Sequence, residues 1–282
     1  MQTFDQTRKD LPATHPCRDD RRWHATSQSL STVSILGVRI VNASSEEAIE
    51  IIERLLQREV TRTTAIYIVN AHTLNLATES REYLRVLNEA HAVFADGTGA
   101  RWAARMRGVR MKANLVGTDL VPELFRSTAG RGYRYFLLGA NAGTIEKAAE
   151  ACARLYPGWR LAGFHHGYVQ DDMDAARVIQ QINSAQPHLL LVGMGNPLQE
   201  LWIHRHHERI RVPVSVGIGG LFNYWGGEIK RAPHWVRRHG SEWLQILIQQ
   251  PHKWRRYLLG NPKFLFRVIA HLPSERSPRP GP

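Results

Sequence analysis

Cysteine is scarce in this chain, and its two cysteines do not suit a structural role. Cys17 lies in a polar N-terminal stretch and Cys152 in a helical pattern of the 282-residue sequence. Two such residues support neither a disulfide framework nor a zinc site built on cysteine. A reducing cytoplasm is the compartment that this composition favours.

Long hydrophobic runs are also missing. Residues 1–32 contain no apolar stretch of signal-peptide length, which predicts a disordered leader, and residues 273–282 are predicted to form a disordered tail. The longest uncharged stretch, 212–227, is interrupted by five glycines and falls short of the roughly 20 apolar residues of a membrane-spanning helix. Any membrane contact is therefore expected to be peripheral.

Two nucleotide-binding fingerprints are absent. The sequence contains neither G-x-G-x-x-G nor G-x-x-x-x-G-K-[ST]. Their absence disfavours a P-loop kinase and a Rossmann-type nucleotide-binding oxidoreductase, although the oxidoreductase stays open as an alternative.

Acidic residues are rare near the C-terminus. Residues 230–282 hold 11 Lys or Arg against two acidic residues, a balance of +9 out of the formal net charge of +12. Such a local basic segment attracts polyanions, which include nucleic acid, anionic lipid and diphosphate substrates. A basic nucleic-acid-binding protein is thus a second alternative, but the tryptophans of this segment lack the regular spacing of a base-stacking platform.

Apolar runs and amphipathic segments alternate along residues 33–229. This rhythm predicts an α/β fold with a Rossmann-like, mostly parallel sheet flanked by helices, followed by a basic amphipathic helical appendage over residues 230–272. The expected strands are 33–41, 64–69, 92–95, 133–138, 161–164, 189–192 and 212–216. The expected helices are 45–57, 76–89, 119–128, 144–155, 172–184 and 198–208.

Polar and glycine-rich turns follow four of the expected strands, at residues 70–72, 96–99, 139–144 and 193–197. The carboxyl ends of parallel strands form the usual ligand crevice, where helix N-termini present N–H groups to anions. Each turn alone is weak evidence, because glycine also serves turns that need a positive φ.

Asp96 is the sharpest catalytic candidate. A carboxylate at a strand end, next to Gly97, can reach a substrate hydroxyl and act as a general base. Spacing alone slightly favours a simpler role, the cap of a following helix. Asp172 and Asp174 have the D-x-D spacing of a metal site, but their place before a helical run favours capping.

The C-terminal segment has the pattern of a membrane-surface helix. Four apolar side chains can share one stripe of a helix kinked at Pro251, with basic residues beside it. The alternative is that the aromatic residues pack on the sheet domain. The residues predicted to bind the membrane are Arg237, Arg238, Trp243, Lys253, Trp254, Arg255 and Arg256.

Several ordered motifs together resemble the WecG/TagA/CpsF family of bacterial glycosyltransferases over roughly residues 35–262. The motifs are A-D-G-T-G at 95–99, G-M-G-N-P-L-Q-E at 193–200, G-G-L-F at 219–222, R-A-P-H-W at 231–235, E-W-L at 242–244 and R-Y at 256–257.

The resemblance implies an inverting transfer of a hexose, without a metal or other cofactor. The donor would be a nucleotide-diphosphate sugar and the acceptor a polyprenyl-diphosphate-linked sugar, at the inner face of the cytoplasmic membrane. It implies that Asp96 is the base, in place of a cap, and that Asn70 and Gln199 bind substrate. Arg231 is expected to stabilise the departing diphosphate, and the oligomeric state stays open, a homo-oligomer included.

The remaining substrate-binding candidates lie in or beside these motifs and turns. They are His72, Gly97, Thr118, Asp119, Gly193, Gly195, Asn196, Glu200, Gly219, Gly220 and Asn223. Three residues depart from the pattern common in the family, namely Ile68, Asn114 and Leu198. These departures leave the donated sugar open among N-acetylmannosamine, its uronic acid, glucose and other hexoses.

Overall fold

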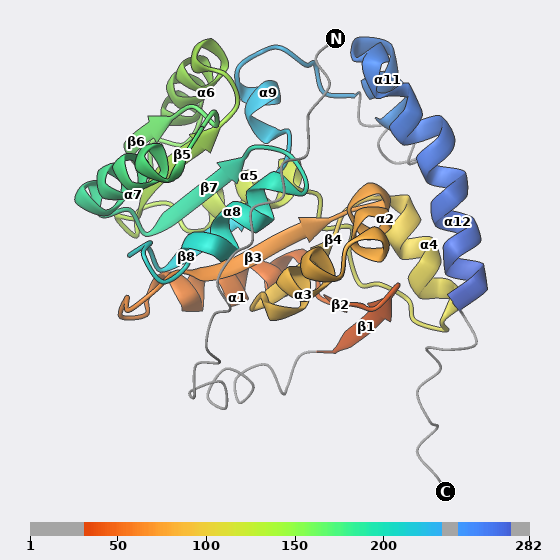
Figure 1. Cartoon of the computed structure of the whole chain (residues 1–282). Helices are drawn as coiled ribbons and strands as arrows, with labels where there is room; N and C mark the ends of the chain where they lie inside the picture. The colour runs from red at the N-terminus through yellow and green to blue at the C-terminus, as the bar shows by residue number, and fades with distance from the viewer. Residues whose placement is uncertain (1–30, 233–241, 272–282) are drawn as a thin grey trace, which may run out of the picture.

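The computed structural model describes residues 31–232 and 242–271, which form a three-layer α/β/α body (Figure 1). Its centre is a six-stranded sheet in which every neighbouring pair is parallel, so the predicted fold class is confirmed. The strand order is β4(Ala92–Ala95), β3(Thr64–Val69), β8(Val214–Gly217), β7(Leu189–Gly193), β5(Arg134–Gly139) and β6(Arg160–His165).

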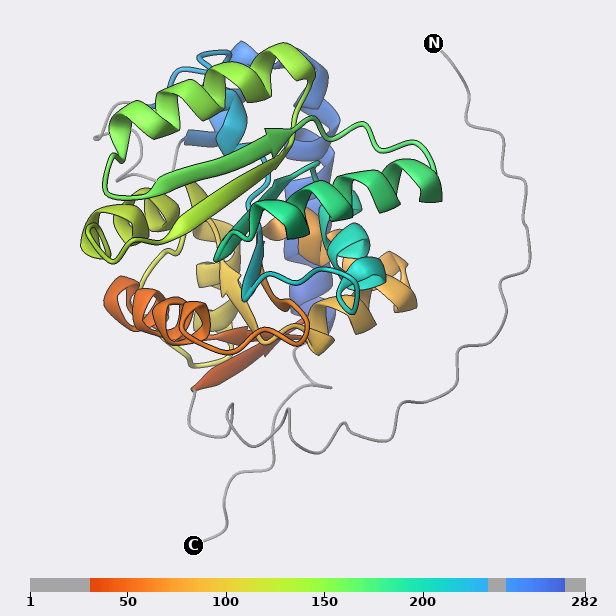
Figure 2. The same cartoon turned by 90° about the vertical axis from the view of Figure 1, so that its left-hand side faces the viewer.

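Helices cover both faces of this sheet, and each face has its own buried core (Figure 2). One face carries α1(Ser45–Leu56), α5(Gly117–Ser127), α6(Ala142–Leu155) and the short α9(Leu221–Trp225). The other carries α2(Ala71–Glu79), α3(Arg81–Glu89), α4(Thr98–Met106), α7(Asp172–Ala185) and α8(Leu198–His206). The strands between them are apolar on both sides, as buried parallel strands are.

Two predicted elements are each divided in the structure. The expected strand 33–41 is an antiparallel hairpin, β1(Thr32–Ile35) with β2(Val38–Val41), because Leu36 and Gly37 turn the chain at φ 52° and 81°. The expected helix 76–89 is α2 followed by α3. Ser80 is extended there and its side chain accepts a hydrogen bond from the Tyr83 N–H, so it starts a new helix. The helix α4 is the one that the capping alternative for Asp96 implied, although its N-cap is Gly97, without a side-chain cap. The short helix α9 is not among the predicted helices.

The carboxyl ends of β5 and β7 approach each other closely. A Cβ added to Gly139 would lie 2.4 Å from the Gly193 carbonyl oxygen, and one added to Gly193 would lie 2.7 Å from the Phe222 ring. Only glycine fits at these two contacts. Gly193, predicted to bind substrate, therefore has a packing role that its place in the motif did not indicate.

The C-terminal segment is helical, and its α-helix is interrupted at Pro251, where a kink is predicted. It comprises α11(Glu242–Gln249), a 3-10 turn at Pro251–Lys253, a π-helical turn at Arg255–Leu259 and α12(Gly260–His271). Among the described residues, no helix has the length and apolar character needed to cross a membrane.

The helix α12 packs on the α/β body. Phe264 and Val268 are buried against α2 and α4, and the Gly99 position lies in contact with the Phe264 ring. Polar contacts add to this packing, since Arg267 donates to the Asn75 carbonyl at 3.1 Å and pairs with Glu79 at 3.0 Å. The alternative prediction, that aromatic residues of the C-terminal segment pack on the sheet domain, thus holds for the side of α12 that carries Phe264.

Candidate active site

Asp96 and Asn70 lie side by side at the carboxyl edge of the sheet. The register pairs Val69 of β3 with Ala95 of β4, so the two polar residues follow directly paired positions. The Asp96 N–H donates to the Val69 carbonyl at 2.8 Å, which fixes the backbone of this pair. A half-buried carboxylate and a half-buried amide thus occupy adjacent strand ends.

The turn after Asp96 depends on Gly97 and Asn114. Gly97 has φ 93°, a conformation that favours glycine. Its N–H donates to the Asn114 side-chain oxygen at 2.7 Å, and the Leu115 N–H donates to the Ala95 carbonyl at 3.0 Å. Asn114, one of the three departures from the family pattern, therefore holds the loop that carries Asp96.

Asn70 uses its amide oxygen locally. The oxygen accepts hydrogen bonds from the N–H groups of His72 at 3.0 Å and Thr73 at 3.3 Å, which caps α2. The amide nitrogen has no hydrogen-bond partner among residues 31–232 and 242–271. Asn70 can therefore donate to a ligand beside Asp96 while it caps the helix.

His72 connects this edge to the C-terminal segment. Burial, with the charges of Arg256 and Lys253, lowers the pKa of His72 to about 4, so the imidazole is neutral near pH 7. Burial and Arg256 also lower the pKa of Lys253. Two cations predicted to bind the membrane thus act electrostatically on a residue predicted to bind substrate, a relation that the linear sequence did not reveal.

Gln199 and Glu200 have no exposed surface and act through their neighbours. The Gln199 side-chain oxygen accepts from the Gly219 N–H at 3.0 Å, and its amide donates to Glu200 at 2.7 Å. Glu200 also accepts from Asn196 at 2.6 Å and from the Tyr83 hydroxyl at 3.0 Å. Their side chains therefore contact other side chains and the Gly219 backbone in this conformation, and substrate contact by Gln199 and Glu200 stays a prediction.

The network around Glu200 fixes two loops at the sheet edge. Asn196 belongs to the loop after β7, and Gly219 to the loop after β8 that leads into α9. Gly195, Gly220 and Asn223, also predicted to bind substrate, lie in these same segments. Gln199 and Glu200 are therefore positioning residues for loops that face the crevice.

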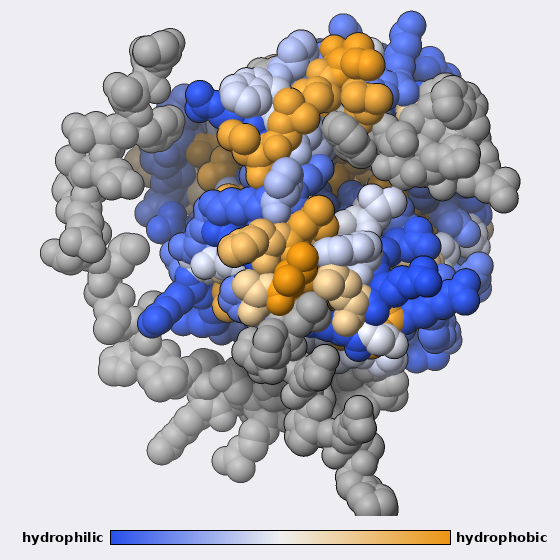
Figure 3. Space-filling model, turned by 90° about the vertical axis from the view of Figure 1, so that its right-hand side faces the viewer, coloured by the Kyte–Doolittle hydropathy of each residue, from blue (hydrophilic) through white to orange (hydrophobic). Residues whose placement is uncertain are grey.

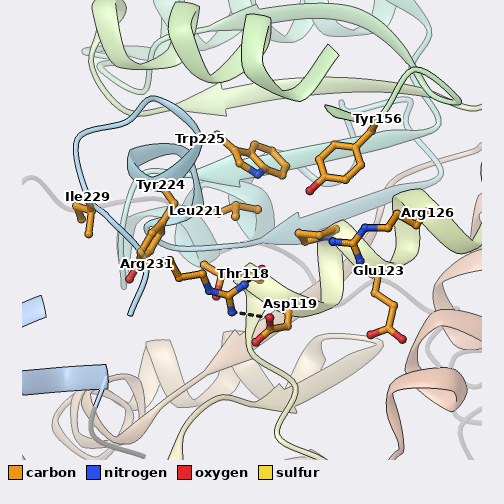
Figure 4. Close-up of a pocket in the computed structure, with 11 residues that line it drawn as sticks. Thr118, Asp119, Glu123, Arg126, Tyr156, Leu221, Tyr224, Trp225, Ile229 and Arg231 are labelled. Atoms are coloured by element: carbon orange, nitrogen blue, oxygen red, sulfur yellow. Dashed lines mark hydrogen bonds and ion pairs between the residues drawn. The ribbon is translucent and has the colours of Figure 1, made fainter. Parts of the chain in front are cut away.

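A cavity of about 320 Å³ opens between α5, α6 and α9 (Figure 4). Arg231 borders it and pairs with Asp119 at 2.5 Å, while its guanidinium donates to the Thr118 carbonyl at 2.9 Å. The Thr118 hydroxyl is buried and lacks a partner within the described residues. Tyr156 and Trp225 form an aromatic wall. The three predicted residues Thr118, Asp119 and Arg231 are thus brought together.

One of the four predicted turns already holds an anion. Glu228 accepts hydrogen bonds from Asn141 and Thr144 at the N-terminus of α6. Its carboxylate lies beside the first turn of α6, where the Asn141 side-chain oxygen already accepts from the Thr144 N–H at 2.9 Å. No pattern in the sequence predicts this contact, because Glu228 is distant from the turn along the chain.

The D-x-D residues Asp172 and Asp174 lie in the first turn of α7, and their neighbour Asp171 is the residue that caps it. Asp171 accepts from the Asp174 N–H at 2.8 Å, and Asp174 pairs with Arg177 in the first turn of α7. Within residues 31–232 and 242–271, no three His, Cys, Asp or Glu side chains are placed to hold a metal ion. The metal-independent chemistry remains a prediction.

Of the residues predicted to bind membrane, the structure places four. Trp254 is exposed with Arg255 above its ring at 5.4 Å, whereas Lys253 and Arg256 are half-buried near His72. Arg237, Arg238 and the side chain of Trp243 lie outside the described residues.

Comparison with known proteins agrees with the motif resemblance. The model of the glycosyl transferase WecG/TagA/CpsF family matches residues 33–278. An N-acetylglucosaminyldiphosphoundecaprenol N-acetyl-beta-D-mannosaminyltransferase of Bacillus subtilis is 30% identical over 254 residues, which cover 90% of this chain and 97% of the relative. A protein of the same name from Staphylococcus aureus is 31% identical over 238 residues, 84% of this chain and 91% of the relative.

The buried carboxyl of Glu200 predicts a pH dependence of folding. Burial raises its pKa from the ordinary 4.5 to about 7. The folded state thus favours the protonated form, and the stability gained below about pH 4.5 is lost as the pH rises through 7. Glu200→Gln keeps the neutral shape, so its free energy of unfolding should exceed that of the wild type at pH 8 by a few kcal/mol and match it near pH 5. Urea titrations at both pH values measure this, and an equal difference at both would contradict it.

The contact between the C-terminal segment and His72 is tested by Arg256→Gln. Loss of the positive charge should raise the pKa of the His72 imidazole, read from its NMR titration. Arg255→Gln is the matched control, since Arg255 lies exposed above Trp254. The same His72 pKa in both variants would show that Arg256 is not close to it.

Proposed function

The chain belongs to the WecG/TagA/CpsF family and is a glycosyltransferase, and we propose that it moves an N-acetylmannosamine-type hexose from a nucleotide-diphosphate sugar to a polyprenyl-diphosphate-linked sugar. The names of its relatives state an acceptor of this kind and an N-acetylmannosaminyl group. Membership in a transferase family argues against the oxidoreductase alternative.

The observation that carries this proposal is the strand register that sets Asp96 beside Asn70 at one sheet edge. Asp96 and Asn70 end adjacent strands, and His72 two residues further on lies within the fields of Arg256 and Lys253. A carboxylate base and nearby positive charges are what a transfer with an anionic leaving group requires.

In the proposed reaction, Asp96 takes the proton of the acceptor hydroxyl as that oxygen attacks the anomeric carbon. The bond from this carbon to the nucleotide diphosphate breaks, and the diphosphate leaves from the opposite side, which inverts the configuration. Asn70 can donate to a sugar oxygen through its free amide nitrogen. Positioning both reactants contributes to the rate because it replaces a bimolecular encounter.

Two groups of cations are proposed to stabilise the negative charge of the donor diphosphate and of the acceptor diphosphate. Lys253 and Arg256 lie beside His72, and Arg231 lies at the mouth of the cavity beneath α9. Arg231 is already paired with Asp119, so it meets an anion with part of its charge compensated. The charge of Arg256 lowers the pKa of Lys253, because two positive charges near each other repel. An anion would relieve this repulsion, so we propose that Lys253 and Arg256 bind a diphosphate more strongly than Arg231 does.

We further propose that the enzyme works as a peripheral protein on the inner face of the cytoplasmic membrane. The exposed Trp254 and Arg255 suit an anionic headgroup layer. The names of the relatives state an acceptor linked to undecaprenol, a lipid, which supports a membrane location for the substrate.

The base assignment predicts the effect of Asp96→Asn. This change keeps the size and polarity of the side chain but removes the proton acceptor, so kcat should fall by about a hundredfold or more. Asp171→Asn is the control, because asparagine caps α7 as well as aspartate does. Turnover of Asp96→Asn at the rate of this control would contradict the assignment. Product formation is measured by mass spectrometry.

The proposed chemistry uses backbone N–H groups and side-chain cations in place of a metal. Full activity is therefore expected after dialysis against EDTA, with no gain on addition of Mg²⁺. Strict dependence on Mg²⁺ in the same assay would contradict metal-independent transfer. It would favour the alternative in which Asp172 and Asp174 bind a metal ion.

A further inference from the structure

The helix α4 exposes an apolar stripe beside α12. Gly99, Trp102 and Met106 have the spacing i, i+3, i+7, which places them on one side of the helix. Gly99 contacts α12, since a Cβ there would lie 3.4 Å from the Phe264 ring. Trp102 and Met106 continue along this side and are 38% and 36% exposed. The stripe therefore extends the surface of α12.

The outer side of α12 and of the π-helical turn before it is also apolar. Figure 3 shows hydrophobic residues gathered along this side of the molecule, with hydrophilic residues to either side. The exposed apolar residues of this region are Leu258, Leu259, Leu265, Phe266 and Ile269. Together with Trp102 and Met106 they form what we term the α4–α12 face. An apolar surface of this extent usually marks an interaction site.

Positive charge borders the α4 side of this face. Residues 101–112 contain five Lys or Arg and no acidic residue. Arg101, Arg105 and Arg110 are exposed, while Lys112 pairs with Glu47 at 2.6 Å. Apolar side chains framed by arginines match an anionic bilayer interface, in which arginine stems lie along the apolar layer and their heads reach the phosphates.

We propose that α4 and α12 dock together on an anionic lipid surface, so that the membrane contact includes the α/β body as well as the C-terminal segment. The proposal rests on the proposed function for the nature of the partner, a membrane that carries the acceptor. The helix α4 begins at Thr98, two residues after Asp96. Docking through α4 therefore holds the catalytic edge near the headgroups, where the acceptor diphosphate lies.

The proposal is tested with Met106→Glu and a matched control, Met173→Glu. Met106 and Met173 are both exposed helical methionines, but Met173 lies in α7, on the side of the molecule away from α12 (Figures 1 and 2). The full-length variants are sedimented with phosphatidylglycerol–phosphatidylcholine vesicles. Met106→Glu should weaken binding on the order of tenfold, because it adds a negative charge and removes an apolar contact. Met173→Glu should bind as the wild type does.

Equal binding of the two variants would overturn the proposal. Loss of a self-associated form in Met106→Glu, with unchanged vesicle binding, would overturn it as well, because the face would then join copies of this chain. A second measurement uses vesicles of brominated phosphatidylglycerol, whose bromine atoms quench tryptophan fluorescence. The fraction of fluorescence quenched should be larger for the wild type than for Trp102→Phe.

Failure of this proposal and failure of the proposed function are separable. Met106→Glu should transfer sugar to a detergent-solubilised, short-chain polyprenyl diphosphate sugar at the wild-type rate, since Met106 lies outside the catalytic edge. An inactive wild type in that assay would count against the transferase reaction. Vesicle binding is measured without substrate and tests the α4–α12 face by itself.

Discussion

The parallel pairing of β3 with β4 is the constraint on which the candidate active site depends. It places Asn70 and Asp96 at the same height on adjacent strands, and the hydrogen bond from the Asp96 N–H to the Val69 carbonyl fixes that register. The two helices that follow these strands, α2 and α4, form the surface on which α12 packs. The strand pair thus sets both the reactive edge and the place where the C-terminal segment docks.

The packing of α12 on α2 and α4 is consistent with the two roles that we propose for the basic segment. Its exposed residues, such as Trp254 and Phe266, suit a lipid surface. The charges of its half-buried cations Lys253 and Arg256 lower the pKa of His72, which lies two residues after Asn70. Under the proposed function, a single segment would bind both the membrane and the diphosphate of a substrate held in that membrane, and the positive charge concentrated there suits both partners.

The sequence predicted the alternating architecture well, because buried parallel strands and amphipathic helices leave clear periodic patterns. It missed the break at Ser80 and the turn at Leu36–Gly37, since a cap or a turn within a periodic run changes the pattern little. It identified the motif that holds Gln199 and Glu200 but not their burial, because a polar residue in a motif looks the same whether it binds substrate or another side chain. The approach of Arg256 to His72 spans much of the chain, and only the tertiary structure brings such residues together.

The most direct measurement is the stereochemistry of the product formed from a panel of α-linked nucleotide-diphosphate hexoses and a polyprenyl-diphosphate-linked sugar. Mass spectrometry identifies the donor that is used, and NMR of the isolated product gives its anomeric configuration. A general base at Asp96 with in-line attack predicts one added hexose in the β configuration. An α-linked product would contradict single-step inversion, and absence of product with every donor would contradict the proposed transfer.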